Sequence, residues 1–83
     1  MNEETLRTTM KVERAKRDLT QADLAALAGV TRRSINAIET GRMVPSVLLA
    51  LRIARALGVT VEELFLLKAP ANAEDADGAV SRG

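Results

Sequence analysis

The segment GVTRRSINAIETG, residues 29–41, holds the side chains of this 83-residue chain that are best suited to chemistry. Arg32, Arg33 and Asn36 carry hydrogen-bond donors close together, and a single glutamate, Glu39, follows them. Guanidinium groups bind phosphates and the O6 and N7 atoms of guanine through paired hydrogen bonds. Two interpretations follow: an ordinary solvated helix face, or a face that enters a polyanion.

Catalytic and metal-binding side chains are scarce in the rest of the chain. It has no cysteine, no histidine and one aromatic residue, a phenylalanine. Disulfides, thiolate or imidazole metal sites and histidine-based acid–base catalysis are therefore excluded, and stacking platforms for single-stranded bases are missing. Catalysis by carboxylates alone is not favoured either, because the adjacent Glu62 and Glu63 do not share a helix face. We expect no enzyme, no metal and no cofactor.

Charge is distributed unevenly along the chain. Residues 1–68 hold 11 basic and 8 acidic residues, a net charge of +3, whereas residues 69–83 hold one and three, a net charge of −2. The basic body permits binding to a polyanion. Apolar residues make up 47% of the chain, but no apolar run is long enough for a membrane span or a signal-peptide core. We expect a cytoplasmic protein without a membrane partner.

Glycine and threonine mark the ends of short helices. Threonines precede three helical patterns, where a hydroxyl oxygen can cap free N–H groups: Thr20, Thr31 and Thr60. Glycines follow three patterns: Gly29, Gly41 and Gly58. An apolar residue before each threonine can pack four positions into the helix, in the pairs Leu19–Leu24, Val30–Ile35 and Val59–Leu64. These signals predict no strand and five helices, over residues 5–17, 21–28, 32–40, 47–57 and 61–67.

The apolar pattern also predicts a core and domain boundaries. The expected inward positions are Val12, Ala15, Leu19, Leu24, Ala25, Ala28, Val30, Ile35, Ile38, Ile53, Ala54, Leu57, Val59, Leu64 and Phe65. Residues 1–4 are expected to form a flexible arm, and residues 5–68 a single domain. Residues 69–83, rich in alanine and acids, lack the apolar surface needed to offset the entropy of ordering, so we predict a disordered tail.

Two of the predicted helices, 21–28 and 32–40, have the layout of a helix-turn-helix with its turn at Gly29. On the second of them, Ile35 and Ile38 share one face. The opposite face carries Arg32, Arg33, Asn36, Ala37 and Thr40. A recognition helix meets base edges with its N-terminal residues, where both arginines lie.

The stretch LTQADLAALAGVTRRSINAIETG, followed by PSVLLALRIARALGVTVEELF, resembles the phage repressor/Cro-type helix-turn-helix family, also called XRE-like. The resemblance covers all five predicted helices. It implies an all-α fold, a compact five-helix lambda-repressor-like DNA-binding domain. It also implies a homodimer on partly palindromic double-stranded operator DNA.

The resemblance further implies roles for individual residues. Base reading would belong to Arg32, Arg33, Asn36 and Ala37. Contacts with the DNA backbone would belong to Gln21, Thr31, Thr40 and Arg42, with Gln21 also bracing the recognition helix. Arg14 and Glu39 would form a structural ion pair. Asp18 departs from the family's usual glycine, but aspartate tolerates left-handed backbone angles better than most residues.

Leucines near the C-terminal end of the domain exceed what one small core can bury. They are Leu48, Leu49, Leu51, Leu66 and Leu67. A homodimer contact would explain them, and so would a larger core covered by the first helix or the tail. We expect a sequence-specific transcriptional regulator, a repressor, acting as a homodimer with helix 32–40 in the major groove. The alternatives are an antitoxin with a toxin partner, a restriction–modification controller protein, or a protein-interaction module.

Overall fold

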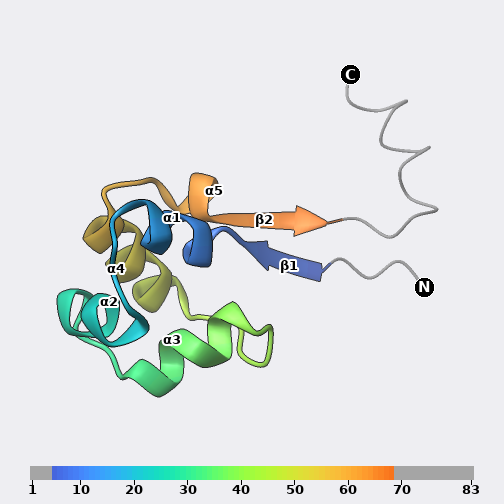
Figure 1. Ribbon diagram of the computed structural model, residues 1–83. Helices are drawn as coiled ribbons and strands as arrows, with labels where there is room; N and C mark the ends of the chain where they lie inside the picture. The colour runs from blue at the N-terminus through green and yellow to red at the C-terminus, as the bar shows by residue number, and fades with distance from the viewer. Residues whose placement is uncertain (1–4, 69–83) are drawn as a thin grey trace, which may run out of the picture.

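The computed structural model describes residues 5–68, which form five helices and two strands (Figure 1). In chain order they are β1 (Thr5–Thr8), α1 (Met10–Lys16), α2 (Gln21–Ala28), α3 (Arg32–Glu39), α4 (Val47–Leu57), α5 (Val61–Leu64) and β2 (Phe65–Lys68). The predicted five-helix, helix-turn-helix fold is confirmed. The predicted arm, residues 1–4, and tail, residues 69–83, lie outside the described residues.

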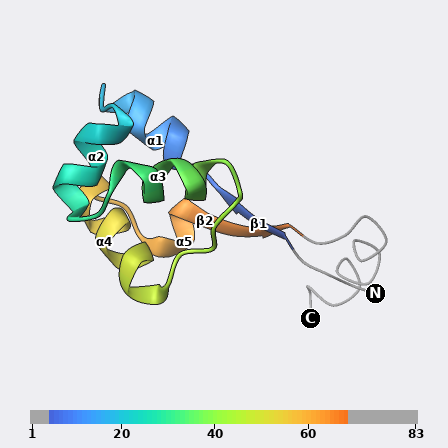
Figure 2. The ribbon, with the colours of Figure 1, turned by 90° about the horizontal axis from the view of Figure 1, so that it is seen from below.

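The prediction of no strand is wrong. β1 and β2 pair antiparallel, with Leu6 opposite Leu67, and the pair projects from the helical body (Figure 1 and Figure 2). The first and last helices are correspondingly shorter than predicted. Thr8 Oγ1 and the Thr9 N–H both donate to the carbonyl of Leu64, at 2.9 and 3.0 Å, and hold the two ends of the domain together. Local patterns do not reveal a strand whose partner lies at the other end of the chain.

Helix ends follow the predicted signals. Thr20 and Thr60 form capping boxes with Asp23 and Glu63, and Thr31 accepts a hydrogen bond from the N–H of Ser34. Asp18 adopts a φ of 55°, the left-handed region that was expected at its position. A further cap, not predicted, is supplied to α4 by the hydroxyl of Ser46. Each such cap stabilises its helix by about 1 kcal/mol.

Apolar side chains from all five helices meet in one core. The largest fully buried side chains are Met10, Leu24, Ile35, Ile53, Leu57 and Leu64. Leu19, Val30 and Val59 pack against them, as the predicted pairs require. Val12 and Ala15, predicted to point inward, are exposed instead, whereas Met10 is buried. The predicted helix 5–17 suggested the wrong inward face, because α1 starts only at Met10 and contacts the core through that residue.

Candidate nucleic-acid interface

The turn between α2 and α3 fixes how the two helices cross. Gly29 adopts a φ of 72° at the end of α2, and the next N–H, from Val30, donates to Ala25 at 2.9 Å. Ala25 itself is buried, and its small side chain permits a close approach of the helices. Ile35 and Ile38 are buried beneath α3. The helix is thereby anchored on one face, which leaves the opposite face outward.

That outward face forms a polar hollow of about 610 Å³. Its lining residues are Gln21, Arg32, Arg33, Asn36 and Arg42. The structure therefore brings five of the eight predicted DNA-contacting residues together from α2, α3 and the following loop. Arg32, Arg33 and Arg42 are exposed, and none of them forms an ion pair within residues 5–68.

The other three predicted contact residues do not line this hollow. Ala37 is half-buried on α3. Thr31 and Thr40 are exposed at the two ends of α3. The hydroxyl of Thr31 caps the helix, and that of Thr40 donates to the carbonyl of Asn36 at 2.9 Å. Both hydroxyls thus form hydrogen bonds with the backbone of α3.

The loop after α3 is held against the end of that helix. The N–H groups of Arg42 and Met43 both donate to the carbonyl of Ala37, at 2.8 and 3.1 Å. These bonds keep the backbone of Arg42 close to the last turn of α3. Arg42 thereby lines the same hollow as Arg32 and Arg33.

Beneath the hollow, Arg14 and Glu39 form the ion pair that the resemblance implies. Arg14 donates from Nε and Nη2 to the two carboxylate oxygens, at 2.8 and 3.0 Å, and the glutamate side chain is only 6% exposed. Arg14 also donates to the carbonyl of Leu19 at 2.9 Å. These contacts join α1, the start of α2 and the end of α3.

Gln21 completes the network. Its Nε2 donates to Glu39 at 3.1 Å and to Asn36 at 3.2 Å, which braces α3 against the start of α2. Burial raises the pKa of Glu39, but hydrogen bonds from Arg14 and Gln21, with the nearby charges of Arg14 and Lys11, hold that pKa below its ordinary value. The hydrogen bond to Glu39 raises the pKa of Arg14. Both groups are therefore charged at neutral pH.

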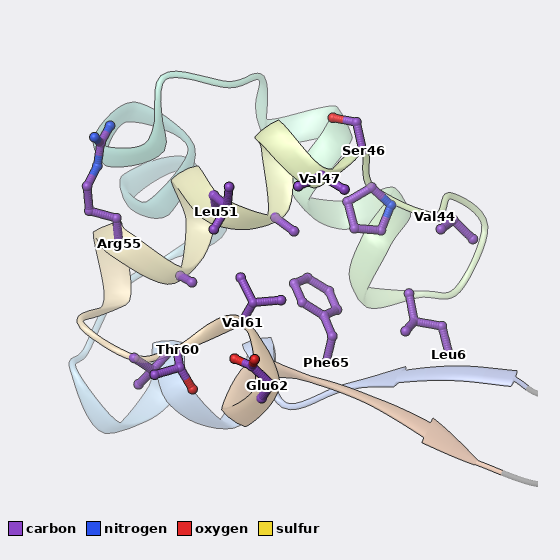
Figure 3. Close-up of a pocket in the computed structure, with 14 residues that line it drawn as sticks. Leu6, Val44, Ser46, Val47, Leu51, Arg55, Thr60, Val61, Glu62 and Phe65 are labelled. Atoms are coloured by element: carbon purple, nitrogen blue, oxygen red, sulfur yellow. The ribbon is translucent and has the colours of Figure 1, made fainter.

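A second surface feature, an apolar groove of about 650 Å³, lies between α4 and α5 (Figure 3). Val61 and Phe65 point into it from one side, and Leu51 lies on the opposite side on α4 (Figure 3). Val44 and Val47 also line it and are 75% and 77% exposed. Among the described residues, none lines both this groove and the polar hollow.

Of the leucines singled out from the sequence, only Leu51 lines this groove. Leu48, Leu66 and Leu67 are exposed elsewhere, and Leu49 is half-buried against the core. Val44 and Val47 were not predicted as surface contacts. Val44 precedes α4 and Val47 begins it, whereas the apolar pattern of that helix indicated contacts at the leucines further along. The sequence indicates their exposure only through their position on either side of Pro45 and Ser46, where a loop leads into α4.

Membrane-spanning helices and metal-binding clusters are not found within residues 5–68. No helix there is long and apolar enough to cross a membrane. No group of three or more His, Cys, Asp or Glu side chains in this range could hold a metal ion.

Residues 10–64 match the model of the helix-turn-helix family, and the chain belongs to that family. It is 47% identical over 75 residues to an uncharacterized HTH-type transcriptional regulator of Methanothermobacter thermautotrophicus, covering 89% of this chain and 99% of the relative. A similar regulator of Methanocaldococcus jannaschii is 44% identical over 61 residues, 74% of this chain and 92% of that one.

Among solved structures, the chain is similar to the restriction-modification controller protein C.AhdI from Aeromonas hydrophila. The TM-score is 0.63 at 30% sequence identity, over 65% of this chain and 82% of the controller protein. These relatives place the protein among HTH-type transcriptional regulators, which bind DNA and are not enzymes. The polar hollow on α3 is the natural candidate for that DNA contact.

Proposed function

We propose that this protein is a sequence-specific transcriptional repressor that binds double-stranded operator DNA in the cytoplasm as a homodimer. The observation that supports the proposal most directly is the exposure of two arginines on the outer face of α3. Arg32 and Arg33 are exposed there without ion-pair partners in the described chain, on a helix anchored by buried Ile35 and Ile38. Unpaired guanidinium groups at the start of a recognition helix suit guanine O6 and N7 in the major groove.

The residues around α3 have complementary roles in this proposal. Asn36 and Ala37 face base edges, and the methyl group of Ala37 can contact the methyl group of a thymine. Gln21, Thr31, Thr40 and Arg42 contact the phosphate backbone, which fixes the position of the helix along the groove. Occupation of a promoter by such a domain would block transcription, so repression is the mode of action that we propose.

The apolar groove supports the proposed homodimer. A second copy of this chain is the occupant that we propose, because its own Val44, Val47 and Leu51 offer matching apolar surface. Exposed apolar patches commonly mark protein interfaces. The groove and the polar hollow share no lining residue, so a partner in the groove would leave both recognition helices free. A two-fold dimer would place them about 34–36 Å apart, one turn of DNA.

Selection of bound duplexes from a random DNA pool tests this function. We expect an enriched inverted repeat whose half-site centres are about 10 base pairs apart, one helical turn. The same pool in single-stranded form is the control and is expected to give no enrichment. Binding without any enriched sequence, or preferential binding of the single strands, would contradict the proposal.

A restriction–modification controller is the second candidate function, and the similarity to C.AhdI favours it. Such a protein would use the same face of α3, so the DNA selection does not separate it from another repressor. Mapping the selected sequence onto the source genome does. A controller requires the site to lie beside genes for a restriction endonuclease and a methyltransferase, whereas another location favours a different regulator.

Antitoxin and interaction-module functions predict a different result. In those functions the fold mainly grips a protein partner, and DNA affinity need not depend on the outer face of α3. Loss of DNA binding on replacing Arg32 and Arg33 supports the repressor, whereas unchanged binding supports a partner-binding role.

A further inference from the structure

The apolar groove between α4 and α5 carries two charged side chains of opposite sign. Arg55 lies in the last turn of α4, and Glu62 lies in the first turn of α5. Among the described residues that line the groove, these two are the only charged ones, and both are exposed. One wall of the groove is therefore positive and the other negative.

Neither charge is neutralised within residues 5–68. No ion pair in this range involves Arg55 or Glu62. In Figure 3 the side chain of Arg55 extends from α4 away from Glu62, which lies on the other side of the groove. The adjacent Glu63 differs from Glu62, because its carboxylate accepts a hydrogen bond from the N–H of Thr60 at 2.8 Å. Glu62 is thus the glutamate of α5 that remains available to a partner.

Two-fold symmetry gives these two charges a use. Across a two-fold interface each contact occurs twice, because the first residue of one copy meets the second residue of the other copy and the reverse. A groove lined by charges of one sign would repel its own copy. One cation and one anion on opposite walls are instead self-complementary about an axis that passes between them.

We propose that Arg55 of each copy pairs with Glu62 of the second copy, and that this doubled ion pair selects the second copy as the partner in the groove. The inference rests on the proposed function, because it requires a homodimer through this groove. Apolar side chains supply the buried area, whereas charges fix the register and exclude partners with a like charge at either position. A helix-turn-helix domain with the same charge on both walls would be rejected.

Two charge reversals, measured apart and mixed, test this inference. Arg55→Glu makes both walls negative, and Glu62→Arg makes both walls positive. Each variant alone should self-associate at least about tenfold more weakly than the wild-type protein, because two attractive pairs become two repulsive ones. In an equimolar mixture, opposite charges meet again at both pairs, so we expect a heterodimer within about threefold of the wild-type affinity. Sedimentation equilibrium measures these dissociation constants.

A mixture of Arg52→Glu with Glu62→Arg is the matched control. Arg52 is exposed on α4 but does not line the groove, and this mixture has the same net charges as the first. Equal recovery in the two mixtures would show that net charge alone decides, which would overturn the inference. Single reversals that self-associate like the wild-type protein would also overturn it. So would reversals that stay weak when mixed, the result expected if both residues only stabilise their helix ends.

Circular dichroism establishes that each variant is folded. For a reversal that unfolds the monomer, a double-mutant cycle with Arg55→Gln and Glu62→Gln takes its place. A combined loss of dimerisation free energy smaller than the sum of the two single losses supports the pair, and a strictly additive loss overturns it. A wild-type protein that stays monomeric would overturn the proposed homodimer as well.

Discussion

The outer face of α3 and the groove between α4 and α5 differ in what lies beneath the exposed side chains. Arg32 and Arg33 line a hollow with Gln21 and Asn36, which take part in a network of hydrogen bonds that includes Glu39. Val47 and Leu51 stand on a helix whose buried side, Ile53 and Leu57, is wholly apolar. Beside the packing of Ile35 and Ile38, the polar face is thus supported by directional hydrogen bonds between side chains, whereas the apolar face rests on packed apolar side chains.

The difference indicates what each surface can recognise. Directional donors select a ligand by the positions of its acceptors, and full charges make its binding sensitive to salt. An apolar groove selects by shape and buried area, with little sensitivity to salt. One small domain thereby offers two independent surfaces, and changes in salt, charge or a single side chain should affect them separately.

A change in salt concentration is expected to give the largest difference between the two surfaces, because it should affect DNA binding much more than self-association. If the dimer contacts six to ten phosphates, its affinity for the selected DNA should fall roughly 10³–10⁵-fold between 50 and 200 mM salt. Self-association through the apolar groove should change little over the same range. Fluorescence anisotropy measures the first, and analytical ultracentrifugation the second. A DNA affinity independent of salt would contradict the electrostatic role of α3.

Removal of the buried charge of Glu39 should give the second-largest effect, a loss of stability. Glu39→Gln leaves Arg14 without its partner, so we expect a loss of about 3 kcal/mol in the free energy of unfolding at pH 7. Folding lowers the pKa of Glu39 below 4.5, the value at which an unfolded glutamate titrates. The ion pair therefore contributes fully to the free energy of unfolding above pH 4.5. This contribution is lost as pH falls through the pKa of Glu39 in the folded protein.

Urea unfolding at pH 7 and at pH 3 measures this effect. The wild-type protein and the Glu39→Gln variant should converge in stability at the lower pH. Glu13→Gln is the matched control, since it removes ion pairs to Lys16 at the end of α1 and to Arg17 directly after it, and should change stability much less. Equal losses in the two variants at pH 7 would show that the buried pair has no special structural role.

Charge placed in the apolar groove should weaken self-association. Leu51 is 53% exposed, so Leu51→Glu should leave the monomer folded and weaken the proposed dimer at least about tenfold, the effect of burying an unpaired carboxylate. Leu27→Glu is the control, because Leu27 is 60% exposed on α2 and does not line the groove. Sedimentation equilibrium compares the two. Equal dimer dissociation constants would place the interface elsewhere.

Two threonine caps should give the smallest effects. Thr31→Ala and Thr60→Ala each remove a hydroxyl that accepts an N–H at a helix start, so each should cost about 1 kcal/mol of stability. Only Thr31 adjoins the proposed DNA surface. After correction for the folded fraction, DNA affinity should fall for Thr31→Ala alone, and an equal fall for both would argue against a phosphate contact at Thr31.

Local signals in the sequence predict much of this fold. The bounds of α2 and α4 match the predicted helices 21–28 and 47–57, because a threonine or an apolar stripe begins each and a glycine ends each. The strands could not be predicted in this way. Their four-residue patterns acquire meaning only when Thr8 and Leu64, 56 residues apart, come together.

In the candidate site, too, some features follow from local sequence signals and others depend on how the helices pack. The outward position of Arg32 and Arg33 follows from helical periodicity and from Ile35 and Ile38 on the opposite face. The hydrogen bonds of Gln21 to Asn36 and Glu39 do not follow from any spacing, because they depend on how α2 crosses α3. Similarly, the groove at Val44 and Val47 exists only after α5 packs beside α4.

The central claim is that the outer face of α3 binds DNA, and replacement of its two arginines tests it most directly. The measurement is the affinity of the Arg32→Ala/Arg33→Ala protein for the selected duplex, beside a control with Arg7→Ala/Arg52→Ala, which removes the same charge from other exposed positions. We expect a loss of at least about 100-fold for the first protein, with unchanged melting temperature, and a much smaller loss for the control. Equal losses in the two proteins, or retained affinity in the first, would contradict the account.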